Sequence, residues 1–248
     1  MMLALRDGSP EGLAERAAPK RGITMFLRAI AGAGAGLFLA GMLLGPAAQA
    51  APVVQHTGTQ LASALLPASY FPSGYKVEKF GHFNSGRRLE HGPAKYHLAT
   101  FGCKKFLLNG LPQTGFGETA DAGNVMNNRG RAYQQVVWQF ASSGQAASFY
   151  RQLDAFTWRC RSVTATLGQD TAKLTTQSLK QTHLGRHPAF RAAQTETLTG
   201  FPATINDTTV TVAGTDVYFI DAAGQKPPSK PAVPAALLHL IARVQALR

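Results

Sequence analysis

The chain has 248 residues, of which 45% are hydrophobic and 15% are charged. This composition is ample for a packed core, and it excludes a collagen, a coiled coil and a disordered protein. Two cysteines are too few for a disulfide-dense miniprotein or a four-cysteine zinc site. The net charge of +12 is spread over both halves of the chain and forms no basic arm. Nucleic acid is therefore not an expected partner.

The first fifty residues have the features of a secretory signal. Residues 29–45 are uncharged and apolar, three basic residues precede them, and Ala48-Gln49-Ala50 supplies the small-x-small cleavage pattern. We predict a signal peptide with an N-terminal extension over residues 1–50, cleaved after Ala50. Residues 51–248 then form a secreted or cell-envelope-associated domain. An uncleaved membrane anchor is the alternative, since the apolar stretch is at the short end of the membrane-spanning range.

Hydrophobic spacing and turn residues predict the elements of the exported part. In chain order they are a helix over 59–66, a strand over 75–80, a polar loop over 84–95, a strand running into a short helix over 96–108, a long connection over 109–130, a strand half-buried over 131–140, a helix over 145–160, strands over 172–182, 188–199, 207–213 and 216–222, a proline-rich connector over 227–234 and a helix over 235–247. Adjacent strands with tight turns predict an α+β fold. We expect a twisted antiparallel β-sheet with helices packed on it, as a single domain.

The two cysteines are predicted to form a disulfide. Export would place Cys103 and Cys160 in an oxidising compartment, where pairing is the simplest outcome. Their Cα atoms should then lie about 4.4–6.8 Å apart. A catalytic thiol is the alternative, but neither cysteine has a recognisable local histidine or aspartate partner.

No motif predicts catalysis. His183-x3-His187 has zinc-ligand spacing, but Gly185 and Pro188 disfavour the helix that such a pair needs, so we expect a loop. Gly115-Phe116-Gly117 lacks the rest of a nucleotide-binding loop and is interpreted as a turn. The acidic residues are scattered, and no serine nucleophile motif is present. We therefore predict no catalytic, cofactor-binding or metal-binding residues and no cofactor.

Several segments together resemble one known family. They are Leu61-x3-Leu65-Leu66-Pro67 followed by Phe71-Pro72-x-Gly74, Cys103 followed by Phe106, Leu107 and Leu108, and Val136 to Phe140 followed by Ala146-Ala147, Phe149 and Trp158-Arg159-Cys160. With the late hairpin and the closing helix, this pattern resembles the PknH-like extracellular domain, the sensor-domain family of actinobacterial secreted proteins, lipoproteins and receptor kinases. The resemblance spans nearly all of residues 59–247. It implies a twisted antiparallel sheet with helices and a cleft, and a role in ligand sensing or envelope binding without catalysis. Members often carry two disulfides, whereas this chain can form one.

These observations predict an exported, non-catalytic ligand-binding or sensor-like domain at the bacterial cell envelope. We expect a monomer that binds a small molecule or an envelope ligand, anionic ligands included, and this chain carries no kinase domain. A small secreted hydrolase of envelope polymers is one alternative. It requires a serine and a carboxylate to converge on a histidine, and the candidates are five of the seven histidines: His82, His91, His97, His183 and His187. A basic adhesin for an anionic envelope polymer is the other alternative.

Overall fold

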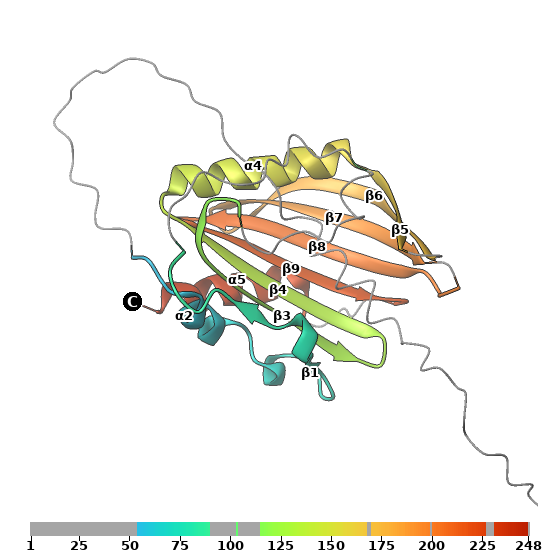
Figure 1. Cartoon of the computed structure of the whole chain (residues 1–248), viewed down its shortest axis with the longest axis horizontal. Helices are drawn as coiled ribbons and strands as arrows, with labels where there is room; N and C mark the ends of the chain where they lie inside the picture. Colours follow the sequence, from blue (N-terminus) through green and yellow to red (C-terminus); the bar gives the residue numbers. More distant parts are fainter. Residues whose placement is uncertain are drawn as a thin grey trace, which may run out of the picture.

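A single antiparallel sheet of nine strands forms the centre of the molecule, with helices on both of its faces (Figure 1). The computed structural model describes residues 54–89, 103, 115–167, 170–198, 200–226 and 231–247. The strands are β1 (Lys76–Val77), β2 (Phe83–Asn84), β3 (Glu118–Asn128), β4 (Arg131–Phe140), β5 (Ser162–Leu167), β6 (Asp170–Leu184), β7 (His187–Leu198), β8 (Thr204–Ala213) and β9 (Asp216–Gly224). The helices are α2 (Gly58–Ala64), α4 (Ser143–Arg159) and α5 (Val233–Gln245), with short 3₁₀ turns at Ala68–Tyr70 and Lys79–Gly81. The α+β prediction is confirmed.

The strands follow the order β1-β3-β4-β9-β8-β7-β6-β5, and β2 also pairs with β3. Three of the neighbouring pairs, β3–β4, β6–β7 and β8–β9, are hairpins with two-residue turns. The β8–β9 turn falls at Gly214-Thr215, where turn residues predicted it. The pairing of β4 with β9 brings together strands that are far apart in the sequence.

Strand β3 corrects the sequence prediction, which placed a long connection over 109–130. Eleven residues, ETADAGNVMNN, pair along their length with β4 and are mostly buried. Ala, Asp, Gly and Asn have low β-propensity, so no local signal indicated a strand. Its partner strand imposes the conformation. Strand β5 was also not predicted. The strand expected over 75–80 is reduced to Lys76–Val77, since only these residues pair with β3.

Helix α4 covers one face of the sheet, and its boundaries agree with the predicted helix over 145–160. The hydroxyl of Ser142 accepts a hydrogen bond from the backbone N–H of Gln145, which caps the first turn. One face of the helix is buried against the sheet. On this face the Phe149 ring packs against the rings of Trp138 and Phe140. The core on this side of the sheet is therefore aromatic and apolar beneath the helix.

Helices α2 and α5 cover the opposite face, so β4 is buried on both sides rather than half-buried as predicted. A capping box between Thr57 and Gln60 caps the N-terminus of helix α2. The guanidinium of Arg243 on α5 donates to the carbonyl oxygen of Ala64 at 2.7 Å, which joins the two helices. On α5, Leu240 is buried, whereas Leu238 is 42% exposed.

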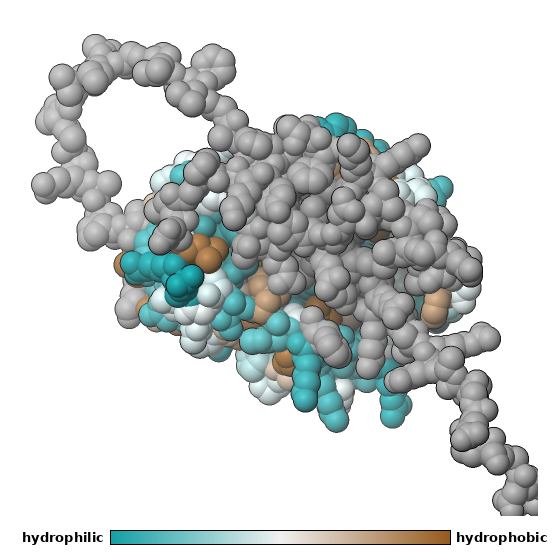
Figure 2. All heavy atoms as spheres, in the orientation of Figure 1, coloured by the Kyte–Doolittle hydropathy of each residue, from teal (hydrophilic) through white to brown (hydrophobic). Residues whose placement is uncertain are grey.

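The surface that Figure 2 shows mixes hydrophilic and hydrophobic side chains. Hydrophilic side chains project from its lower edge, where Figure 1 places β1 and the end of the β3–β4 hairpin. Within the described residues, no helix is long and apolar enough to cross a membrane. The predicted signal segment over residues 1–50 lies outside the described part of the chain, as do most of the predicted elements over 96–108.

Candidate functional site: a buried polar cluster on the sheet

Buried polar side chains gather on the α4 face of the sheet, beyond the apolar core under the helix. We call these residues the polar cluster: Gln134, Thr176, Gln194, Glu196, Asn206, Thr208 and Asp221. They come from five strands, and none is more than 8% exposed. Side chains of these types are usually found at the surface, so their burial together needs an explanation.

The strand register brings the cluster together. Asp221 on β9 lies opposite Gln134 on β4 and Thr208 on β8, which makes one row across three strands. The next row places Asn206 opposite Gln194, which in turn lies opposite Thr176. Directly paired residues project from the same face of a sheet, with Cβ atoms about 4.5–5.5 Å apart. The positions between them on this face are small, namely Ala132, Ala192 and Ala223.

Hydrogen bonds inside the cluster satisfy only part of it. The Thr208 hydroxyl donates to Asp221 Oδ1 at 2.7 Å. The Gln194 amide donates to Thr176 Oγ1 at 3.0 Å. The side chain of Asn206 is hydrogen-bonded to Glu196. Each of these pairs joins neighbouring strands, so the cluster is held rigidly by the sheet.

Five side-chain atoms in the cluster have no hydrogen-bond partner within the described residues: Gln134 Nε2, Gln134 Oε1, Gln194 Oε1, Glu196 Oε2 and Asn206 Oδ1. In folded proteins the large majority of buried polar atoms have a partner, because leaving one without a partner costs about 1–3 kcal/mol. Four of the five atoms are acceptors. Most of the unfilled hydrogen-bonding capacity of these five atoms is therefore that of acceptors.

Two carboxyl groups of the cluster resist ionisation. Burial raises the pKa of Asp221 to about 7; the hydrogen bond from Thr208 acts against this shift, and the charges of Asp207 and Glu196 add to it. Burial likewise raises the pKa of Glu196, and its hydrogen bond with Asn206 opposes the rise. Near neutral pH, Asp221 is thus divided between its neutral and charged forms.

A second pair of buried carboxyl groups lies on β3. The backbone N–H groups of Gly115 and Phe116 donate to the Glu118 carboxylate at 2.7 and 2.6 Å, so the predicted turn at Gly115–Gly117 serves to hold this side chain. Neither oxygen of Asp121 has a partner. Burial, with the nearby charge of Glu118, raises the pKa of Asp121 to about 7. The sequence indicated scattered acidic residues; the fold instead buries five of them, including Asp216, in its central strands.

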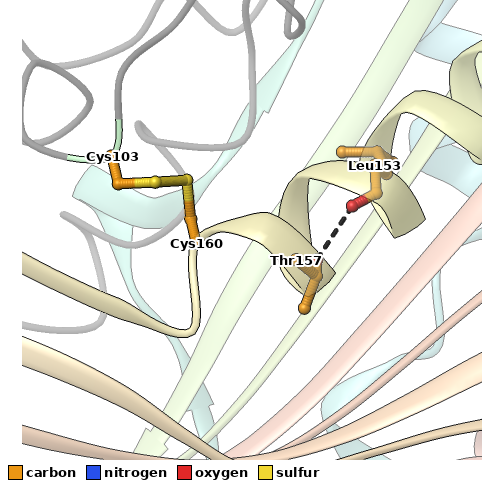
Figure 3. The surroundings of a disulfide bond; sticks show 4 residues. All are labelled: Cys103, Leu153, Thr157 and Cys160. Atoms are coloured by element: carbon orange, nitrogen blue, oxygen red, sulfur yellow. Dashed lines mark hydrogen bonds between the residues drawn. A yellow bond between two sulfur atoms is a disulfide. The ribbon is translucent and has the colours of Figure 1, made fainter.

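The disulfide prediction is confirmed. Cys103 and Cys160 are bonded, with their Cα atoms 5.3 Å apart (Figure 3). Cys160 follows the last turn of α4, where the Thr157 hydroxyl donates to the carbonyl oxygen of Leu153 at 2.9 Å. The bridge therefore attaches the end of α4 to a segment 57 residues earlier in the chain.

The histidines do not form a catalytic group in the described residues. His183 and His187 were expected in a loop; they lie instead in β6 and β7, on either side of the two-residue turn at Gly185-Arg186. In the described part of the chain, no histidine side chain is hydrogen-bonded to a serine or a carboxylate. The same part contains no group of three or more potential metal-binding His, Cys, Asp or Glu residues. His91 and His97 lie outside it.

No protein-family model matches the chain, and no curated protein matches it in sequence. Among solved structures, its fold is similar to the extracellular domain of PknH from Mycobacterium tuberculosis, with a TM-score of 0.56, 17% sequence identity, and coverage of 79% of this chain and 98% of that one. The uncharacterised Rv0999 ortholog from Mycobacterium smegmatis matches at 13% identity, covering 76% of this chain and 95% of its own. Its TM-score of 0.37 is too low to support a conclusion. The first match shows that this chain has a PknH-like extracellular domain fold, as the sequence resemblance implied.

Proposed function

We propose that this protein is a non-catalytic ligand-binding module that acts outside the cytoplasm, and that the polar cluster is its binding site. The observation that carries the proposal is the group of five unpartnered side-chain atoms, buried side by side on neighbouring strands. A group of hydrogen-bonding atoms that a rigid sheet holds without partners is preorganised to bind. A purely structural role would favour apolar residues at these positions.

The chemistry of the cluster favours a small ligand rich in hydrogen-bond donors. The acceptor atoms without a partner in the described residues belong to Gln134, Gln194, Glu196 and Asn206, and the Gln134 amide nitrogen is the one donor atom among the five. A polyhydroxylated molecule or an amine matches this excess of acceptors. Because the pKa of Asp221 is about 7, a neutral polyol can bind to the protonated cluster and an ammonium group to the ionised one.

Three observations support a location outside the cytoplasm. The first fifty residues have the pattern of a secretory signal. The chain contains a disulfide between its two cysteines, which is typical of proteins that fold in oxidising compartments. The solved structure with the similar fold is itself an extracellular domain.

The hydrolase alternative has less support. A hydrolytic site needs a nucleophile or a general base within hydrogen-bond reach of the group that orients it. In the polar cluster the Asp221 carboxyl is instead hydrogen-bonded to Thr208, and the Glu196 carboxyl to Asn206. Neither carboxyl is hydrogen-bonded to a histidine in the described residues. The arrangement is suited to holding a molecule and offers no activated nucleophile.

The experiment is to measure binding of myo-inositol, glucose and putrescine to the full chain by saturation-transfer NMR. At least one of these probes should give a saturable signal, and Gln134→Met should remove it. Gln145→Met is the matched control, because Gln145 is exposed on α4, away from the cluster. Equal signals for the wild type and Gln134→Met would contradict the proposal, as would equal losses in both variants.

A further inference from the structure

Two hollows lie on either side of the turn between β3 and β4. One, of about 620 Å³, is lined by Ser73, Gly74, Asn128, Arg129 and Arg131. The other, of about 480 Å³, is lined by the same two arginines and by residues that include Asn127, Thr204 and Lys226. Volumes of this size are typical of small-molecule sites. Neither lining contains an acidic residue.

The second hollow brings three cations together from separate segments. Arg129 is in the turn, Arg131 begins β4, and Lys226 follows the end of β9. The segments are in contact at Gly224, where an added Cβ would lie 3.3 Å from Arg131 Cγ and from the Lys226 carbonyl oxygen. The ion pair found among the described residues joins Arg191 to Asp207. Within that part of the chain, Arg129, Arg131 and Lys226 form no ion pair. Two carboxyl groups adjoin the lining: Glu78 accepts a hydrogen bond from the Asn127 amide at 2.8 Å, and Glu196 lies opposite Thr204 in the β7–β8 register.

The turn itself holds Arg129 at a conformational cost. Arg129 has a φ of 49° and is the one non-glycine residue with a positive φ in the described part of the chain; Gly130 follows with a φ of 79°. Two-residue hairpin turns with two positive φ values favour Asn-Gly, because Asn tolerates the left-handed region better than a long side chain. An arginine at this position is less favourable for the turn than asparagine, yet its side chain lines both hollows. Strain of this kind is found preferentially at functional sites.

We propose that the hollow between Arg129, Arg131 and Lys226 binds a phosphate group, carried by a small soluble molecule or by a lipid headgroup. A phosphate presents oxygens in several directions and can accept from two guanidinium groups and an ammonium group at once. The Thr204 hydroxyl lines the same hollow and is a neutral donor. A carboxylate presents only two oxygens in one plane, so it would leave part of this set unused. The remaining volume accommodates the organic group attached to the phosphate.

This site shares no residue with the polar cluster, although Thr204 lies opposite Glu196, and its test uses other ligands and other variants than the test of the proposed function. The full chain is titrated by isothermal calorimetry at low salt with inorganic phosphate, glycerol 3-phosphate, glycerophosphoglycerol and acetate. Phosphate-bearing probes should bind saturably and more tightly than acetate. Stronger binding of the monoester, glycerol 3-phosphate, assigns the phosphate to a soluble ligand. Stronger binding of the diester, glycerophosphoglycerol, assigns it to a lipid headgroup.

Arg129→Asn is the decisive variant, because it removes the cation and suits the turn better. It should weaken phosphate binding about fivefold, as expected for one partly exposed charged contact. The double variant Arg129→Asn/Lys226→Gln should lose saturable binding. Arg186→Asn is the control, since Arg186 is an exposed arginine in the β6–β7 turn at the opposite end of the sheet. The proposal is overturned if phosphate does not bind, if acetate binds equally well, or if Arg186→Asn weakens binding as much as Arg129→Asn.

Discussion

Two neighbouring glutamines on β4 offer a direct test of the unpartnered polar cluster. Gln134 and Gln135 are 1% and 0% exposed, and they project from opposite faces of the same strand. Neither atom of the Gln134 amide has a partner. Gln135 instead donates to the Leu66 carbonyl oxygen at 2.8 Å and to Asn124 Oδ1 at 3.0 Å, and accepts from the Leu66 N–H at 2.9 Å. The two side chains differ in hydrogen bonding while burial and residue type are matched.

Replacing each glutamine by methionine, which is similar in length, should change stability in opposite directions. Gln134→Met removes an unpartnered buried amide and should raise the free energy of unfolding by about 1–2 kcal/mol. Gln135→Met loses three hydrogen bonds, each worth about 0.5–1.5 kcal/mol, and leaves buried partners unsatisfied. It should therefore lower the free energy of unfolding by about 3–5 kcal/mol. The loss should also loosen the attachment of α2, whose following segment is held by Gln135.

The assay is equilibrium unfolding in guanidinium chloride, followed by far-ultraviolet circular dichroism and by the fluorescence of buried Trp138. Agreement between the two signals checks that unfolding is two-state. If Gln134→Met destabilised the protein by as much as Gln135→Met, the Gln134 amide would have partners in the native state. The argument for a binding site on this face would then fail.

Three further predictions concern the disulfide, the buried carboxyls and the glycines. Cys160→Ser should lower the free energy of unfolding by about 2–5 kcal/mol, because it opens the bridge to Cys103; chemical denaturation without reductant measures this, and an unchanged midpoint would contradict it. The pKa of Asp221 is about 7 in the folded protein, above the value of 3.8 for a free side chain. The folded protein therefore favours the protonated carboxyl, and the stability that this protonation contributes is full below about pH 4 and is lost as the pH rises through 7. Asp221→Asn should thus raise stability at pH 8 by about 4 kcal/mol and leave it nearly unchanged at pH 4, in denaturation curves at the two pH values; equal effects at both would refute the raised pKa. Gly58→Ala should destabilise by about 1–3 kcal/mol, because the new Cβ would lie 2.4 Å from the Ser85 nitrogen and 2.7 Å from the Asp121 oxygen. Gly144→Ala, also in a first helical turn but with nothing nearer than Ser142 Oγ at 3.8 Å, should stabilise by about 0.5–1 kcal/mol, and thermal unfolding that shifted the same way for both alanines would contradict this contrast.

The elements that the sequence predicted well are those with strong local signals. The helical spacing of hydrophobic residues over 145–160 predicted α4. The turn residues Gly214-Thr215 predicted the connection between β8 and β9. The disulfide was predicted from two cysteines in a chain that the sequence pattern predicts to be exported. In each case the signal lies in a few consecutive residues or in a count, and needs no knowledge of the sheet.

The polar cluster could not be found in this way. Its residues are separated by up to 87 positions, from Gln134 to Asp221, and only the pairing of β4 with β9 makes them neighbours. Along each strand a polar residue at alternate positions also indicates a face exposed to solvent, which is the commoner case. A sheet that is covered on both faces reverses that interpretation, since the polar face is then buried.

The sequence by itself determined the helix α4, the closing helix α5, the β8–β9 hairpin, the bridge between Cys103 and Cys160 and the α+β class, because each follows from periodicity, turn chemistry or redox chemistry. The tertiary structure decided that ETADAGNVMNN is a central strand, and that buried glutamine, asparagine and carboxyl side chains share one face. It also decided that three cations surround one hollow at the β3–β4 turn. The physical reason is the same in each case. Register between distant strands, and burial by elements elsewhere in the chain, give these residues surroundings that their sequence neighbours do not specify.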